Sequence, residues 1–148
     1  MKVKRIDHID MAVTDVEESI KVFQKMGFEL LFRTMHEGGA AELKLPGANQ
    51  PIFELHPVPP HYKYHSATPG IYHVAFLVDN AQETYDNLKA EGFKIKDGWD
   101  GPKFLADSGR NMVDTAVIGE WGEFFLQFVE EGRKPPITRQ KGEAGIYH

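Results

Sequence analysis

Residues 8–28 read HIDMAVTDVEESIKVFQKMGF, and residues 73–93 read HVAFLVDNAQETYDNLKAEGF. The two stretches align without a gap. His8 then matches His73, and Gly27 matches Gly92. A repeat of this period indicates one supersecondary unit that is used twice. Because a twofold repeat can bring equivalent side chains to a shared site, the matched histidines are the first candidates for function.

Each copy predicts a strand followed by a helix. In the first copy, residues 5–13 alternate and are rich in Ile, Met and Val, which favours a strand. Asp15 then takes the N-cap position, and an apolar helical stripe follows at Val16, Ile20 and Phe23. The second copy repeats this order: strand 71–78, cap Asn80, stripe Ala81, Tyr85 and Leu88, stop Gly92.

Three further strands are predicted after each helix, separated by glycine and proline turns. They span 28–35, 40–45 and 51–57 in the first half, and about 93–99, 111–118 and 123–130 in the second. Glycine-rich residues 97–110 predict an extended loop. Each half therefore reads β-α-β-β-β, and two copies predict an α+β fold with mostly antiparallel strands. The predicted organisation is module 1 at about 3–57, linker 58–70, module 2 at about 71–130, and a polar tail 131–148, flexible or reaching a neighbouring subunit.

The length and composition predict one domain with an ordinary core. The chain has 148 residues, 41% of them hydrophobic, and a net charge of −5 without a basic stripe, which argues against nucleic acid as a partner. No cysteine is present, so a metal would need His, carboxylate, amide or water ligands. No apolar run approaches the roughly 20 residues of a membrane span, and the N-terminus lacks a signal-peptide pattern. We therefore expect a cytoplasmic protein that does not bind a membrane.

Four side chains are expected to converge if the modules pack with twofold symmetry. Alternation along the strands places His8 and His73 at matching positions, Glu54 on the last strand of module 1, and Gln127 at the equivalent position of module 2. Two imidazoles, one carboxylate and one amide oxygen suit one divalent metal ion such as Zn, Ni, Co, Mn or Fe(II). His56 shares the Glu54 face, where we expect it beyond the mouth of the site, with orientation of the carboxylate as the alternative.

The pattern resembles the vicinal oxygen chelate superfamily, which includes glyoxalase I, methylmalonyl-CoA epimerase, fosfomycin and bleomycin resistance proteins, and extradiol dioxygenases. The stretches that carry the resemblance are IDHIDMAVTDVEESIKVF, FELHPV, GIYHVAFLVDNAQETYDNLKAEGF and FFLQFVE. The resemblance spans residue 5 to about 130 and implies two βαβββ modules in a half-open, mostly antiparallel β-barrel around a metal. It assigns the ligands to the first and last strands of each module, which are His8, Glu54, His73 and Gln127.

The chain departs from the family pattern at the fourth ligand. Relatives commonly end in DPDGNxIEL, whereas this chain reads GEWGEFFLQFV, so Gln127 is assigned by the strand match alone. Epimerase-like members use the ligand order His, Gln, His, Glu. This chain therefore has the amide and the carboxylate exchanged between modules.

The resemblance implies a metal-dependent lyase or isomerase/epimerase that acts on a small oxygenated substrate through a metal-stabilised enolate, and a homodimer. Glu54, the one carboxylate among the predicted ligands, is the candidate catalytic base. One alternative is an extradiol-type Fe(II) dioxygenase, in which His8, His73 and Glu54 would form the iron site. Another is a non-catalytic protein that binds a small molecule or antibiotic.

Several other residues have two interpretations. Trp99 and Phe104 line a pocket or simply pack, and Lys103 and Arg110 bind an anionic group or lie on the surface. The linker side chains form a solvated loop or a lid over the substrate; they are His61, Tyr62, Tyr64 and His65.

Overall fold

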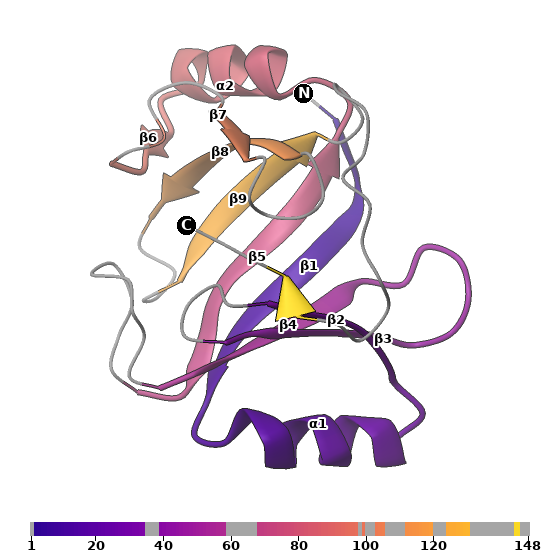
Figure 1. Cartoon of the computed structure of the whole chain (residues 1–148). Coiled ribbons are helices and arrows are strands. Elements are labelled where there is room, and N and C mark those ends of the chain that lie inside the picture. Colours follow the sequence, from indigo (N-terminus) through magenta and orange to yellow (C-terminus); the bar gives the residue numbers. More distant parts are fainter. Residues whose placement is uncertain are drawn as a thin grey trace.

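A computed structural model of the chain describes residues 2–34, 39–58, 68–97, 99, 103–105, 112–119, 124–130 and 144–145, and the observations below concern these residues. They contain two helices and ten strands, arranged as in Figure 1. The helices are α1 (Val16–Lys25) and α2 (Ala81–Ala90). The strands are β1 (Val3–Val13), β2 (Glu29–Thr34), β3 (Ala41–Lys44), β4 (Ile52–Pro57), β5 (Gly70–Val78), β6 (Lys94–Ile95), β7 (Lys103–Leu105), β8 (Met112–Ile118), β9 (Phe125–Glu130) and β10 (Ala144–Gly145).

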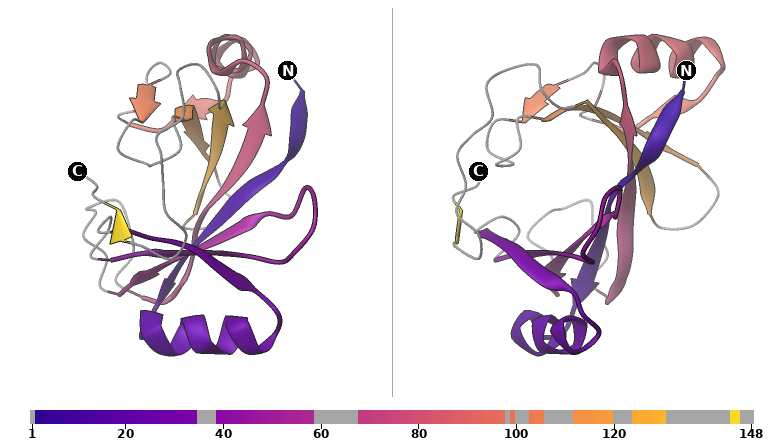
Figure 2. Two further views of the ribbon diagram at one scale, coloured as in Figure 1. Left: turned by 45° about the vertical axis from the view of Figure 1, so that its right-hand side comes forward. Right: turned by 90° about the vertical axis from the view of Figure 1, so that its right-hand side faces the viewer.

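The strands form one open, mostly antiparallel sheet in the order β10-β2-β3-β4-β1-β5-β9-β8-β6, and β7 pairs with β8 outside this order. The modules join where β1 pairs antiparallel with β5. In each module the last strand returns to pair in parallel with the first, as β4 does with β1 and β9 does with β5. Figure 2 shows the two halves of the sheet opening away from each other, with α1 and α2 at opposite ends. The predicted α+β fold of two βαβββ modules in a half-open barrel is confirmed.

The register between β1 and β5 has local twofold symmetry. His8 stands opposite Ala75, and Asp10 stands opposite His73. Asp10 and Ala75 are equivalent in the repeat, as are the two histidines, so each pair is the image of the other. The twofold axis therefore passes between the two histidines.

The parallel strand pairs follow the same rule at the ends of the modules. Asp10 pairs with Glu54 on β4, and Ala75 pairs with Gln127 on β9. Because Asp10 and Ala75 are equivalent, the register makes Glu54 and Gln127 equivalent as well.

Both helices begin and end where the repeat predicts. The side chains of Asp15 and Asn80 accept hydrogen bonds from the backbone N–H groups three residues later, at 3.0 and 2.9 Å. Gly27 and Gly92 follow the last turns with positive φ angles of 97° and 85°, which other residues rarely adopt. An N-cap of this kind stabilises a helix by about 1 kcal/mol.

Each helix covers its own hydrophobic cluster on the outer face of the sheet. The buried members under α1 are Val16, Ile20, Ala41, Leu43 and Leu55, and those under α2 are Val78, Leu88, Val117 and Phe128. Thr84 takes the buried helix position predicted for Tyr85, which is half-buried. Since strand side chains alternate between faces, the residues next to these core positions point to the inner face, where the polar groups gather.

Three segments differ from the predictions. β6 ends at Ile95 instead of residue 99, and the predicted loop at 97–110 contains β7, which pairs with β8. Residues 144–145 of the predicted tail form β10 beside β2 of the same chain. These short strands form by pairing with strands that already exist in the sheet. Their formation therefore depends on tertiary structure, and the local sequence pattern does not predict it.

Candidate metal and catalytic site

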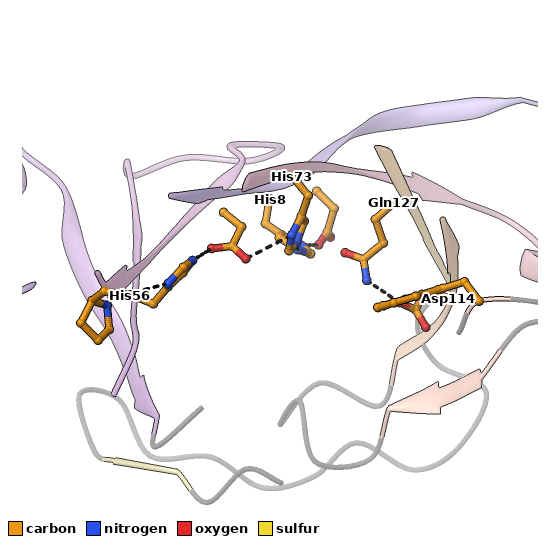
Figure 3. Close-up of polar contacts among 9 residues, drawn as sticks. His8, His56, His73, Asp114 and Gln127 are labelled. Atoms are coloured by element: carbon orange, nitrogen blue, oxygen red, sulfur yellow. Dashed lines mark hydrogen bonds and ion pairs between the residues drawn. The ribbon is translucent and has the colours of Figure 1, made fainter. Parts of the chain in front are cut away.

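His8 and His73 meet on the inner face of the sheet. Their Nε2 atoms lie 3.0 Å apart, and their rings are inclined at 80°. Both residues are buried, with exposed fractions of 4% and 8%. Figure 3 shows them at the centre of a row of polar side chains that crosses both modules. The repeat therefore brings these two histidines into direct contact.

An aspartate lies at the Nδ1 atom of each histidine. Oδ2 of Asp7 is 2.7 Å from Nδ1 of His8, and Oδ2 of Asp10 is 3.1 Å from Nδ1 of His73. Both aspartates are fully buried. An ionised carboxylate only accepts hydrogen bonds, so a neutral ring that donates to it from Nδ1 would keep the Nε2 lone pair for a metal. Metal-bound histidines in proteins are held by carboxylates in this way.

The two facing Nε2 atoms are close enough to share one cation. Two lone pairs in contact repel each other, so ring nitrogens at this distance share either a proton in a hydrogen bond or a metal ion. Two nitrogen ligands bound to one metal at about 2.1 Å lie about 3.0 Å apart at a right angle and about 3.4 Å apart at the tetrahedral angle. The observed separation of 3.0 Å therefore fits two imidazoles that share one ion.

Gln127 on β9 directs an amide oxygen toward the same point. Its Nε2 donates a hydrogen bond to Oδ2 of Asp114 on β8. Figure 3 shows the amide oxygen on the side away from Asp114, toward the two histidines. Oε1 is buried, and none of the described residues donates a hydrogen bond to it. Such a group costs about 1–3 kcal/mol when it has no partner, and a bound metal would provide one.

Glu54 lies on the inner face of β4, half-buried, between Asp10 of β1 and Glu42 of β3. Glu42 has an exposed fraction of 3% and was not predicted. In the part of the chain that the structure describes, no three or more His, Asp or Glu side chains are grouped so that they could hold a metal. The place of Glu54 in the ligand set therefore stays a prediction.

His56 lies behind Asp10, and the prediction that it sits beyond the mouth of the site is wrong. It is fully buried, and its Nε2 lies 2.7 Å from Oδ1 of Asp10. Its Nδ1 is 3.4 Å from the carbonyl oxygen of Pro57, and its ring packs 5.0 Å from the ring of Tyr72. His56 pairs with Asp10 because Asp10 lies on the adjacent strand, diagonal to it in the register. It therefore fixes the carboxylate that holds His73.

Aromatic rings line the module 2 side of the site. Phe125 stacks on His73, with ring centroids 4.6 Å apart. Nζ of Lys96, a residue that is 7% exposed, lies 4.7 Å from the ring centroid of Trp99 and 5.0 Å from that of Phe125. Aromatic faces attract cations, so these contacts hold the ammonium beside Phe125, the ring that stacks on His73. Trp99 thus packs against the site, and its indole nitrogen also donates to Asp114 at 2.8 Å.

Three aspartates are buried along this row of side chains. Asp7, Asp10 and Asp114 have exposed fractions of 0%. Buried charges are costly unless they are paired or close to a metal, and a divalent cation would offset part of this charge. Two imidazole nitrogens and an amide oxygen, with a carboxylate on the neighbouring strand, match metals of intermediate softness. The chemical types of these donors therefore fit a divalent metal ion.

Some predicted residues lie outside the part of the chain that the structure describes. They are Arg110, the linker residues His61, Tyr62, Tyr64 and His65, and the side chains of Lys103 and Phe104. Four buried acidic residues of the inner face were not predicted as site residues: Asp7, Asp10, Glu42 and Asp114. Strand alternation places Asp10 on the same face as His8, so the sequence did contain an indication of its position. Asp7 lies at a register shift between Ile6 and His8, which alternation cannot reveal.

Comparison with known families decides the relationship. Residues 5–113 match the sequence profile of the Glyoxalase/Bleomycin resistance protein/Dioxygenase superfamily. The chain belongs to this superfamily. The match includes His8, Glu54 and His73 and ends before Gln127. The predicted family resemblance is confirmed.

Individual proteins similar to this superfamily member come from several bacteria. Uncharacterized protein YwbC of Bacillus subtilis (strain 168) is 30% identical over 124 residues, which are 82% of this chain and 97% of YwbC. The methylmalonyl-CoA epimerase structure from Mycobacterium tuberculosis superposes with a TM-score of 0.70 at 19% identity, covering 88% of this chain and 89% of that one. Hypothetical protein BH1468 from Bacillus halodurans C-125 gives a TM-score of 0.68 at 19% identity over 88% and 96% of the chains. At these identities the solved structures show a shared fold.

None of the helices described here has the length and apolar content that crossing a membrane requires.

Proposed function

We propose that this superfamily member is a divalent-metal-dependent lyase or isomerase/epimerase. It would act on a small oxygenated substrate by moving a proton on or off the carbon next to a carbonyl group. The observation that carries the proposal is the pair of facing Nε2 atoms of His8 and His73, 3.0 Å apart, with a buried aspartate at each Nδ1. Membership of the superfamily and the fold shared with methylmalonyl-CoA epimerases support it, although fold alone does not fix the substrate.

His8, His73 and Gln127 would hold the metal, with Glu54 as the fourth ligand. When bound, the metal supplies Lewis-acid stabilisation of the negative charge that develops on a substrate oxygen. Asp7 and Asp10 keep the two rings in the tautomer that leaves Nε2 free to bind. The chain itself would thus hold its metal-binding nitrogen atoms in position before any substrate binds.

Proton transfer needs a carboxylate beside the substrate carbon, and β3 and β4 provide two candidates. Glu54 is the first, because it lies on the inner face next to Asp10 of β1. Glu42 stands directly opposite it on β3 and is more deeply buried. We propose that Glu54 takes the proton, and that Glu42 shapes its surroundings from the neighbouring strand.

Metal content is the first test of the site. We expect about one divalent ion per chain in the wild-type protein, as a site with several protein ligands binds, and loss of that ion in His8→Ala and in His73→Ala. The measurement is elemental mass spectrometry after reconstitution with Zn, Ni, Co, Mn or Fe(II). Asp86→Ala, which changes an exposed residue of α2, is the control and should keep the metal. Wild-type protein that holds no metal after every reconstitution would contradict the proposal.

Hydrogen–deuterium exchange at the carbon next to a carbonyl tests the chemistry. Metal-loaded protein is incubated in D₂O with 2-methylacyl thioesters and 2-oxoaldehyde hemithioacetals, and exchange is followed by NMR. We expect Glu54→Gln to slow exchange by about 10²–10⁴-fold, the usual contribution of a general base, and Glu42→Gln to slow it less. Full exchange in metal-bound Glu54→Gln would exclude Glu54 as the base. Oxygen uptake with a catechol and Fe(II), without any exchange, would favour the dioxygenase alternative.

A further inference from the structure

We propose that Asp114 and Trp99, here called the orienting pair, determine which end of the Gln127 amide faces the metal site. The inference rests on the proposed function, because it concerns a ligand of the proposed metal. It assigns positioning roles to two residues that would not contact the ion themselves.

An amide ligand has an orientation problem that a carboxylate lacks. Its two ends have nearly the same shape, but only the oxygen can bind a metal, whereas the nitrogen only donates hydrogen bonds. Any facing Nε2 atom of His8 or His73 that carries a lone pair is an acceptor, so in the absence of metal it would attract the NH₂ end of Gln127. Some other group must therefore hold that end away from the histidines.

Asp114 meets this requirement. Its Oδ2 accepts a hydrogen bond from Nε2 of Gln127, and its side chain is fully buried. In the register of β8 and β9, Ala116 stands opposite Gln127, so Asp114 reaches the amide diagonally from the same face. An acceptor placed there leaves Oε1 directed toward the histidines, as Figure 3 shows.

Trp99 fixes the carboxylate from another side. Its indole Nε1 donates to the same Oδ2 of Asp114 at 2.8 Å. Trp99 is itself anchored through its backbone, because its N–H donates to the carbonyl of Lys96 at 2.9 Å and its carbonyl accepts from Thr115 at 3.2 Å. The carboxylate therefore has two N–H donors that hold one oxygen in place.

Module 1 supports the inference by contrast. Glu54 is the equivalent of Gln127, and the residue equivalent to Asp114 is Ala40, two positions before Glu42. A carboxylate presents an oxygen at either end and needs no orienting group. The module with the amide has an aspartate at this place, and the module with the carboxylate has an alanine.

The expected effect is on metal affinity, independent of turnover. In Asp114→Asn the new amide can donate to Oε1 of Gln127, which lets the ligand turn its NH₂ end toward the histidines. We expect the dissociation constant for Co(II) to rise by about 10–100-fold, the usual effect of losing a residue behind a metal ligand. Trp99→Phe keeps an aromatic ring but removes the indole donor, so we expect a smaller rise.

A second substitution separates orientation from structural damage. Gln127→Glu removes the orientation problem, but in the wild-type background it places a carboxylate against Asp114. In the double variant Asp114→Asn/Gln127→Glu that repulsion is gone and the ligand has oxygen at both ends. We expect the double variant to recover Co(II) affinity that Asp114→Asn loses.

The experiment is a Co(II) titration of the full chain, followed by visible absorption bands that report the ligand set. Asp97→Asn, an exposed aspartate of module 2, is the matched control. If Asp114→Asn binds Co(II) as tightly as wild type, the orienting role is wrong while the metal site stands. If the double variant stays as weak as Asp114→Asn, the loss is structural and the orienting role is again wrong. Wild-type protein that binds no Co(II) overturns the proposed function and this inference together.

Discussion

The two modules share one backbone plan, yet they hold their histidines differently. His8 is held by Asp7, its neighbour on the same strand, whereas His73 is held by Asp10, which belongs to the other module. The repeat therefore fixes where the candidate ligands lie, but each module has assembled its supporting residues separately. Because the contact between Asp10 and His73 crosses the β1–β5 pair, the site depends on the junction between the modules.

The largest difference between modules is expected when the two supporting aspartates are changed in turn. Asp10 lies against two imidazoles, those of His56 and His73, whereas Asp7 lies against the imidazole of His8. Breaking a buried charged pair costs about 3–5 kcal/mol, so we expect that loss of unfolding free energy in Asp10→Asn. For Asp7→Asn we expect about 1–3 kcal/mol, the cost of leaving one buried group without its partner. Urea unfolding of both metal-free variants gives the comparison.

The same two variants should lose metal affinity to a similar extent, because each disturbs one histidine. The expected loss is about 10–100-fold, measured by Co(II) titration, with Asp79→Asn, an exposed residue between β5 and α2, as control. If Asp10→Asn and Asp7→Asn lose the same unfolding free energy in urea, His56 adds nothing to the stability of the Asp10 contacts.

Much of the fold was predictable because the repeat, the helix caps and the strand alternation agree. His8 and Asn80 each have an equivalent residue 65 positions away in the other copy. The elements predicted for one copy can therefore be checked against the other. Matching the last strands of the two modules in sequence predicted the equivalence of Glu54 and Gln127, and the register of the two parallel strand pairs agrees with it. Local pattern and tertiary structure point to the same answer in these elements.

The supporting residues were harder to predict because the repeat does not include them. Asp114 corresponds to Ala40, and His56 corresponds to Val129. Neither residue therefore has a similar polar residue at the equivalent position of the other module. Their contacts are diagonal across neighbouring strands, and a single sequence does not reveal which diagonal is used. Short strands such as β7 form only because an edge of the sheet is available, which is likewise a tertiary property.

A smaller difference is expected where each helix is tied to its own sheet. In module 2 the backbone N–H of Ala81 donates to the buried carboxylate of Glu130 at 2.8 Å. In module 1 the corresponding link is an ion pair of 2.7 Å between Arg33 and Glu17, whose side chain is 66% exposed. We expect Glu130→Ala to lower the unfolding free energy by about 1–3 kcal/mol. Arg33→Ala should lower it by about 1 kcal/mol or less, because solvent screens the pair.

Salt separates these two effects in chemical denaturation with urea. The Arg33–Glu17 contribution should fall further in 1 M NaCl, whereas the Glu130 contribution should hardly change, because buried interactions are screened much less. A strong salt dependence for Glu130→Ala would mean that this carboxylate acts through long-range charge and not through its hydrogen bond.

The smallest difference is expected at the helix N-caps. Asp15 and Asn80 accept equivalent hydrogen bonds, so replacing either with alanine should cost about 1 kcal/mol. Asp15→Ala should cost slightly more than Asn80→Ala, because it also removes a negative charge from the positive end of α1, and because Glu130 still holds the first turn of α2 in the second variant. Asp15→Asn keeps the acceptor and removes only the charge, so it should lie between wild type and Asp15→Ala in urea midpoint. If Asn80→Ala were the more damaging cap variant, the contact from Glu130 would not be sufficient to hold α2, and the two helix starts would be less alike than their shared sequence pattern indicates.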